Sequence, residues 1–131
     1  MTAAGNAVLD YIESRNLFAR IPAAALALCN ALAPLLSHRH VGDVRGLGLL
    51  VGIEFVRDKP TRMPFESSEA IAEKIRAAAM HEGVLVYPTQ GCVDGARGDH
   101  ILLAPPFIIT PEESALIATA LAAALAKVFP D

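Results

Sequence analysis

Apolar and polar side chains alternate most clearly between Val41 and Val56. One face of the strand that this alternation predicts would carry Leu49, Val51, Ile53 and Phe55. The opposite face would carry Leu50, Gly52, Glu54 and Val56. Because side chains alternate with a period of two along a strand, the first face is continuously apolar. We therefore expect residues 41–56 to form the central strand of a small sheet that helices cover.

The N-terminal third has helical periodicity instead. Residues 3–15 predict one helix, which Asn16 would end, and residues 17–36 predict a second helix. Pro22 fits only if the second helix begins near it, because proline suits the first turn of a helix. Pro34 should kink or end that helix, since it removes a backbone hydrogen bond.

Shorter elements follow the predicted central strand. Residues 56–66 read as an exposed connection, after which Ser67 or Ser68 would cap a helix that ends near His81 or Glu82. Gly83 is well placed as the residue that stops this helix. Residues 84–87 then predict a short strand, which Pro88 would end.

The last third contains a loop, a strand and a helix. Residues 89–98 form a loop rich in glycine, and residues 100–104 predict another strand. The final helix has the clearest start, with Thr110 as N-cap, Pro111 at the first helical position and Glu113 completing a capping box. A chain of this order predicts an α+β fold, with helices packed on one face of a mostly antiparallel sheet. At 131 residues, it is expected to form a single domain spanning 1–131.

Composition narrows the possible partners and compartments. The net charge is −3 and the basic residues are scattered, so a nucleic-acid-binding surface is not expected. Two cysteines are too few for a secreted disulfide scaffold, and the N-terminus lacks a basic leader. The most apolar stretch, 23–36, is short and is interrupted by Asn30 and Pro34, so no membrane-spanning helix is expected. These features favour a cytoplasmic protein.

No local pattern is a complete catalytic or metal-binding motif. The turn at Arg45 to Gly48 lacks the spacing of a phosphate-binding loop and is better explained as structural. The possible metal ligands match no compact Cys/His spacing; they are His38, His40, His81, His100, Cys29 and Cys92. We expect solvent around His38 and His40 and a packed environment around Cys29. We therefore predict no catalytic, cofactor-binding or metal-binding residue in this sequence.

Two arginines stand near carboxylates. Asp43 and Arg45 would point to the same side of a strand that began there, and we expect each to form structural pairs with other charges. Arg97 ends the glycine-rich loop, where its guanidinium could grip a substrate carboxylate bidentately. The alternative for Arg97 is a structural ion pair with Asp94, Asp99 or another nearby carboxylate. The three lysines, Lys59, Lys74 and Lys127, lie in settings that do not lower a pKa for Schiff-base chemistry.

Three stretches taken together resemble a known family. VGDVRGLGLLVGIEFVRDK, EGVLVYP and GARGDHILLAPPFIITPEE are similar, in order and spacing, to the C-terminal small domain of class III pyridoxal-phosphate-dependent aminotransferases. The resemblance implies an α+β domain with a three- to four-stranded sheet that packs on a large cofactor-binding domain. Family members transfer an amino group to a keto acid or aldehyde through a lysine Schiff base. Their catalytic lysine and phosphate-binding residues lie in the large domain, so none is carried onto this sequence.

The same resemblance gives one site residue and several functional hypotheses. Some family members place a substrate-carboxylate arginine before the GDH motif, which corresponds to Arg97, although others place it where this chain has Gly95. The chain is thus expected to be a domain or fragment of an aminotransferase, inactive alone, with pyridoxal phosphate as cofactor only in the complete enzyme. Its partners would be the large domain or further copies, through an exposed apolar surface. The alternatives are a non-catalytic interaction module or a small sensor of carboxylate ligands.

Overall fold

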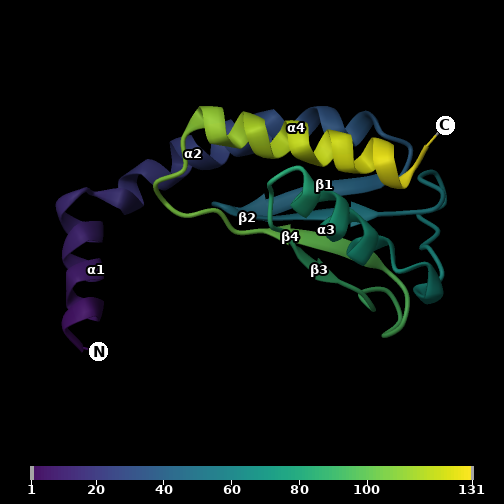
Figure 1. Ribbon diagram of the computed structural model, residues 1–131, viewed down its shortest axis with the longest axis horizontal. Helices are drawn as coiled ribbons and strands as arrows, with labels where there is room; N and C mark the ends of the chain where they lie inside the picture. Colours follow the sequence, from purple (N-terminus) through teal and green to yellow (C-terminus); the bar gives the residue numbers. More distant parts are fainter. Residues whose placement is uncertain (1, 131) are drawn as a thin grey trace.

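The computed structural model describes residues 2–130. Its sheet has four antiparallel strands in the order β1-β2-β4-β3 (Figure 1). The strands are β1 (Val41–Leu47), β2 (Leu50–Phe55), β3 (Tyr87–Thr89) and β4 (Asp99–Leu103). β2 and β4 occupy the centre of the sheet, and β1 and β3 form its edges. The expected α+β fold with antiparallel pairing is confirmed.

Helices cover one face of this sheet (Figure 1). The helices are α1 (Thr2–Ser14), α2 (Leu17–Leu32), α3 (Ile71–His81) and α4 (Pro111–Val128), with two short 3₁₀ helices, η1 (Ala33–Ser37) and η2 (Ser67–Glu69). α4 packs against both α2 and α3, whereas α1 extends away from the rest of the molecule. The two layers are thus the sheet and the helices α2, α4 and α3.

The core lies between these layers because one face of each strand is apolar. Its largest fully buried side chains include Leu28, Leu32, Val51, Ile53, Phe55, Ile75, Ile101 and Leu121. The other face of the sheet carries charged side chains together with apolar ones such as Leu50 and Leu102. There Arg45 pairs with Asp43 at 2.9 Å and with Glu54 at 2.7 Å, and the second contact is a structural pairing with another charge, as expected. Glu54 raises the pKa of the Arg45 guanidinium by accepting its hydrogen bond, and Asp43 adds to this effect.

The predicted single strand 41–56 is wrong, because the segment forms a hairpin. β1 and β2 pair antiparallel with Leu47 opposite Leu50, which leaves a two-residue turn at Gly48 and Leu49. Gly48 has a φ of 59°, and glycine is favoured where a turn needs positive φ. The apolar side chain of Leu49 is buried, with an exposed fraction of 6%. This turn therefore lacks the polar residues that most turns contain.

β3 also differs from the prediction. The strand was expected at 84–87 and ended by Pro88, but it runs from Tyr87 to Thr89 and contains Pro88. Pro88 is tolerated because β3 is an edge strand, where a residue without an N–H can face outward.

Proline has a different effect at each of its two positions in the second helix. Pro22 lies inside α2, five residues after Leu17, so the expectation that this helix tolerates Pro22 only near its start is wrong. Pro34 acts as predicted, because α2 ends at Leu32 and the chain continues as η1. Asn16 separates α1 from α2 in a left-handed conformation with a φ of 48°, which agrees with the break expected there.

Much of the apolar surface of α1 and α2 is uncovered. α1 has no buried residue among those described, and Leu9, Phe18 and Leu26 are about 60% exposed. The stretch Leu17–Ser37 is long and apolar enough to span a membrane, contrary to the expectation from 23–36, and only 17% of its most apolar part is buried. Core helices of water-soluble proteins can also pass this test of length and composition. α1 and α2 together therefore present an exposed apolar face.

Candidate functional site

The candidate site is the loop that connects β3 to β4 and ends at Arg97. The loop closes on itself through a hydrogen bond from the Val93 N–H to the Arg97 carbonyl, at 3.0 Å. Gly98 follows with a φ of 103°, and a Cβ at this position would lie only 2.9 Å from the Val93 nitrogen. Only glycine fits so close an approach without a shift of the backbone. The loop therefore holds Arg97 directly before β4.

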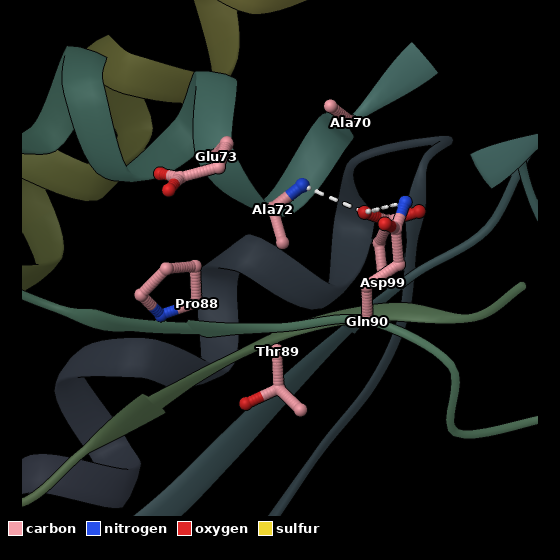
Figure 2. Close-up of a pocket in the computed structure, with 7 residues that line it drawn as sticks. All are labelled: Ala70, Ala72, Glu73, Pro88, Thr89, Gln90 and Asp99. Atoms are coloured by element: carbon pink, nitrogen blue, oxygen red, sulfur yellow. Dashed lines mark hydrogen bonds between the residues drawn. The ribbon is translucent and has the colours of Figure 1, made fainter. Parts of the chain in front are cut away.

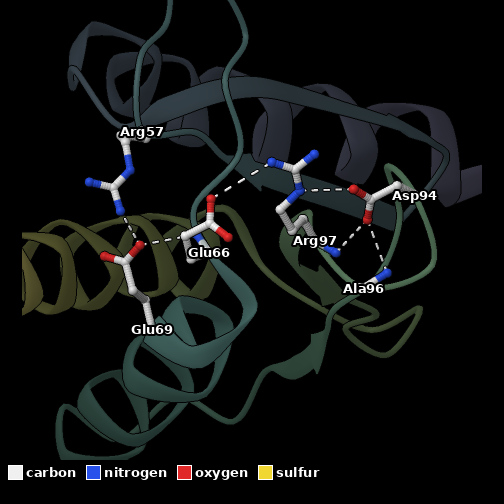
Figure 3. A network of polar contacts seen from close by, with 6 residues as sticks. All are labelled: Arg57, Glu66, Glu69, Asp94, Ala96 and Arg97. Atoms are coloured by element: carbon white, nitrogen blue, oxygen red, sulfur yellow. Dashed lines mark hydrogen bonds and ion pairs between the residues drawn. The ribbon is translucent and has the colours of Figure 1, made fainter.

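Two carboxylates face the Arg97 guanidinium (Figure 3). Its Nε lies 2.8 Å from Asp94 Oδ2, and its Nη1 lies 3.7 Å from Glu66 Oε1. Asp94 Oδ1 accepts hydrogen bonds from the backbone N–H groups of Ala96 and Arg97, at 3.1 and 2.7 Å. Asp94 is thus the firm partner of Arg97, and Glu66 is a looser one.

These contacts shift the pKa of both partners in the directions that favour charge. The backbone N–H of Arg97 lowers the pKa of Asp94 to about 2, with help from the Arg97 side chain and the Ala96 N–H. The hydrogen bond to Asp94 raises the pKa of Arg97. Both groups therefore stay ionised through the neutral range, and 41% of the Arg97 side chain remains exposed to solvent. The expected structural ion pair with Asp94 is present, and it leaves part of the guanidinium accessible.

Glu66 is itself fixed by a second set of contacts (Figure 3). Its backbone N–H donates to Glu69 Oε2 at 3.0 Å, and Glu69 also pairs with Arg57. This network joins the segment before α3 to the loop of Arg97. A ligand carboxylate that approached Arg97 would compete with Glu66, whose contact is the longer of the two.

Two residues after Arg97, Asp99 connects the site to α3 (Figure 2). Its side chain is fully buried, and Oδ1 accepts a hydrogen bond from the Ala72 N–H at 2.9 Å and one from Gln90 at 3.4 Å. The first of these satisfies a free N–H at the start of α3, as an N-cap would. The predicted cap at Ser67 or Ser68 is wrong, because α3 begins only at Ile71.

A small cavity of about 120 Å³ lies beside Asp99. Its wall consists of Ala70, Ala72, Glu73, Pro88, Thr89, Gln90 and Asp99 (Figure 2). Within residues 2–130, Asp99 Oδ2 and Thr89 Oγ1 are buried without a hydrogen-bond partner. Cavities of this size suit a water molecule or a small polar group better than a cofactor.

The other candidate ligands lie elsewhere. His38 and His40 are partly buried. The centroid of the tilted His40 ring lies 4.4 Å from that of Phe129 and 5.3 Å from that of Phe65. The expectation that solvent surrounds these histidines is therefore wrong. Cys29 is exposed on α2, not packed as predicted. In the part of the chain that the structure describes, no three His, Cys, Asp or Glu side chains are grouped to hold a metal ion.

The lysines do not form a cofactor site in this chain. Lys59 donates to the Leu36 carbonyl in an exposed connection, and Lys74 and Lys127 lie on exposed sides of α3 and α4. A lysine that binds pyridoxal phosphate needs an enclosed pocket that orients the ring and lowers the pKa of the amine. None of the three lines the cavity beside Asp99, so the residues present do not fit the cofactor's attachment point.

One contact was not foreseen from the sequence. Cys92 Sγ lies 3.0 Å from His100 Nδ1. The two residues are eight positions apart, on a loop and on a strand, and no local spacing rule predicts that they meet.

Residues 1–125 match the family model described as Aminotransferase class-III. An uncharacterized aminotransferase of Schizosaccharomyces pombe is 47% identical over 77 residues, which cover 59% of this chain and 17% of that protein. Adenosylmethionine-8-amino-7-oxononanoate aminotransferase of Nitratidesulfovibrio vulgaris is 36% identical over 111 residues, which cover 85% of this chain and 19% of that protein. The chain thus spans about a fifth of the length of the curated relatives it matches.

Solved structures agree with these sequence relatives. The amine transaminase of an uncultivated Pseudomonas species, crystallised in a PLP-bound form, superposes with a TM-score of 0.83 and 34% identity, over 97% of this chain and 27% of that one. The adenosylmethionine-8-amino-7-oxononanoate aminotransferase of Methanocaldococcus jannaschii gives a TM-score of 0.81 and 30% identity, over 95% of this chain and 26% of that one. All four proteins are named as aminotransferases or transaminases.

Proposed function

Because the chain belongs to the class III aminotransferase family, we propose that it is the C-terminal small domain of a pyridoxal-phosphate-dependent aminotransferase. The complete enzyme would transfer an amino group from an amine donor to a keto acid or aldehyde. The observation that carries this proposal is the superposition of 97% of the chain on an amine transaminase at a TM-score of 0.83. The same segment makes up only 27% of that transaminase.

The cofactor chemistry is assigned to the other part of the enzyme. Pyridoxal phosphate supplies an electron sink for the carbon that gains or loses the amino group. None of this chain's lysines is placed to hold it, so the domain is proposed to be inactive in amino transfer by itself. Its own contribution is to bind substrate and to exclude water at the edge of the site.

The rest of the enzyme is also the proposed partner of the exposed apolar surface. Leu9, Phe18 and Leu26 on α1 and α2 expose about 60% of their surface each. An apolar face of this kind favours association, because removing apolar surface from water lowers the free energy. We assign this face to contact with the large domain.

Arg97 is the proposed anchor for the carboxylate of the substrate. Its guanidinium is charged, partly exposed and preoriented by Asp94 through Nε. An incoming carboxylate could replace Glu66, which lies 3.7 Å from Nη1. A guanidinium suits this role because its fork matches the two oxygens of a carboxylate.

A chimaera tests the proposal directly. The chain would replace the matching segment of the Pseudomonas amine transaminase, and cofactor binding and amino transfer to pyruvate would be measured. We expect the chimaera to bind the cofactor and to transfer amino groups. The purified chain mixed with pyridoxal phosphate should show neither the absorbance of lysine-bound cofactor nor amino transfer. A folded, cofactor-loaded chimaera that transfers no amino group would contradict the proposed function.

The role of Arg97 is tested in the same chimaera. Arg97→Ala should raise KM for pyruvate by roughly 10- to 100-fold, the range expected when a charged hydrogen bond is lost. An aldehyde acceptor without a carboxylate should keep its KM. The matched control is Arg20→Ala, which removes an exposed arginine from α2. Equal effects on pyruvate and the aldehyde would remove Arg97 from carboxylate binding.

A further inference from the structure

A thiol and an imidazole form a pair that the proposed aminotransferase function does not use. Cys92 Sγ lies 3.0 Å from His100 Nδ1, within hydrogen-bonding distance, and Cys92 is exposed. His100 is partly buried on β4 between the buried residues Asp99 and Ile101, so its side chain emerges from the face of the sheet opposite the helices. The pair is therefore accessible to small molecules from solvent.

The fold holds both members of the pair in place. The Cys92 N–H donates to the Gly98 carbonyl at 3.4 Å, which folds the loop back on the start of β4. A side chain at Gly98 would approach the Cys92 nitrogen to 3.2 Å. On the other side, His100 is fixed in the strand ladder between Glu54 of β2 and Thr89 of β3. The contact thus follows from the loop and the sheet register together, since each fixes one of the two residues.

A neighbouring imidazole changes the chemistry of a thiol. Only the thiolate is a strong nucleophile, and a histidine within hydrogen-bonding distance can take the thiol proton and stabilise the resulting anion. Reactive cysteines are accordingly exposed and next to a base, whereas a cysteine without such a neighbour reacts slowly. Cys29 provides the comparison within the same chain, because it is also exposed but lies on α2, outside the loop that holds Cys92.

We propose that Cys92 is a site of reversible oxidation by hydroperoxides, with His100 as the base that activates it. The thiolate sulfur attacks one peroxide oxygen, so that an S–O bond forms while the O–O bond breaks. Sulfur is oxidised by two electrons to a sulfenic acid, and the peroxide is reduced. The leaving hydroxide takes the proton that His100 received, and with hydrogen peroxide the second product is water. A thiol reductant returns the sulfenic acid to the thiol.

The position of Cys92 gives this oxidation a structural consequence. Cys92 and Arg97 belong to one loop, which is closed by the hydrogen bond between Val93 and Arg97. Oxidation places an oxygen on the sulfur and removes the thiolate that His100 stabilises. The loop then loses one of its attachments to β4. The oxidation itself does not depend on the proposed aminotransferase function and is tested without an activity assay.

The experiment measures the oxidation rate of each cysteine separately. The reduced chain is treated with hydrogen peroxide in the presence of dimedone, which traps sulfenic acids, and the label on each cysteine is quantified by mass spectrometry after digestion. We expect Cys92 to be labelled roughly tenfold faster than Cys29, because the neighbouring imidazole can take the thiol proton and so favours the reactive thiolate. Adding dithiothreitol before dimedone should restore the free thiol at Cys92.

Two variants and one condition complete the test. His100→Asn should lower the rate at Cys92 to that at Cys29, and His81→Asn, which changes an exposed histidine at the end of α3, should leave both rates unchanged. At urea concentrations that unfold the chain, the two cysteines should react at equal rates. This comparison tests whether the folded structure activates Cys92 even if His100→Asn does not fold. Equal rates in the folded wild-type chain would overturn the proposal. So would fast labelling of Cys92 in a folded His100→Asn variant.

Discussion

The buried carboxylate of Asp99 accepts a hydrogen bond from the Ala72 N–H at 2.9 Å, so the first residue of β4 caps the beginning of α3. We expect Asp99→Ala to lower the free energy of unfolding by about 1–3 kcal/mol, because a buried backbone donor loses its acceptor. Asp99→Asn keeps an acceptor oxygen and should lose less. Urea unfolding at neutral pH measures both variants.

Asp43→Ala is a suitable control for Asp99, since Asp43 is about half exposed. It should change the free energy of unfolding by less than about 1 kcal/mol, as is usual for surface ion pairs. If Asp99→Ala were as stable as the wild type, another group would have to satisfy the Ala72 N–H.

Asp94 should titrate with a pKa of about 2, below its ordinary value of 3.8. Because the folded chain lowers this pKa, the stabilisation it reflects is complete above the ordinary value and is lost as pH falls through about 2. The largest cause is a backbone N–H, which Arg97→Ala retains. In that variant the pKa should rise only part of the way to 3.8.

Carbon NMR of the Asp94 carboxyl group, followed against pH, measures this pKa in both proteins. Arg45→Ala removes a guanidinium that pairs with Asp43 and Glu54, and it should leave the Asp94 titration unchanged. A fully ordinary pKa in Arg97→Ala would show that the guanidinium, and not the backbone of the loop, controls the carboxylate.

Thr110 begins α4 with a complete capping box. Its Oγ1 accepts from the Glu113 N–H at 3.2 Å, and Glu113 accepts from the Thr110 N–H at 2.8 Å. Thr110→Ala should therefore lower the free energy of unfolding by about 1 kcal/mol. Thr119→Ala makes the same chemical change at an exposed position inside α4 and should have a smaller effect. Thermal unfolding compares the two, and equal losses would mean that the cap does not set the stability of α4.

Leu26 and Leu28 are two residues apart on α2 and differ completely in burial, with exposed fractions of 62% and 0%. Leu28→Ala should lower the free energy of unfolding by about 2–5 kcal/mol because it leaves a cavity in the core. Leu26→Ala should change it by less than about 0.5 kcal/mol.

If the exposed face of α1 and α2 is the contact surface for the rest of the enzyme, Leu26→Glu should weaken association without unfolding the domain. Size-exclusion chromatography of the chain at high concentration measures the self-association that such a face promotes. If a folded Leu26→Glu variant associates and elutes as the wild type does, the contact lies elsewhere.

The parts of the fold that depend on local signals could be predicted from the sequence. The capping box at Thr110 and the helix end at Pro34 act between neighbouring residues, so the sequence alone contains the needed information. The hairpin of β1 and β2 was missed because its turn contains the buried Leu49 in place of a polar residue. Leu49 continues the alternation of buried apolar side chains through Val51, Ile53 and Phe55, so periodicity alone does not separate the turn from a continuous strand.

In the candidate site, too, local contacts could be predicted from the sequence and non-local contacts could not. Arg97 and Asp94 are three residues apart, and their ion pair was among the expected alternatives. Asp99 and Ala72 are 27 residues apart, and their contact depends on how α3 packs on the sheet. The exposure of Cys29 likewise depends on which side of α2 faces α4, which no pattern in an Ala- and Leu-rich helix decides.

The strand order β1-β2-β4-β3 also determines when the sheet can be completed during synthesis. β1 and β2 are neighbours in sequence and can pair as soon as both are made. β3 precedes β4 in the chain but has β4 as its neighbour in the sheet, so it must wait for that strand. Until β4 inserts, β2 has an open edge and β3 has no ladder partner. The pairing of β2 with β4 is the non-local step, and high contact order predicts that it is slow. We therefore expect sheet assembly to be limited by the arrival of β4, the same strand that caps α3.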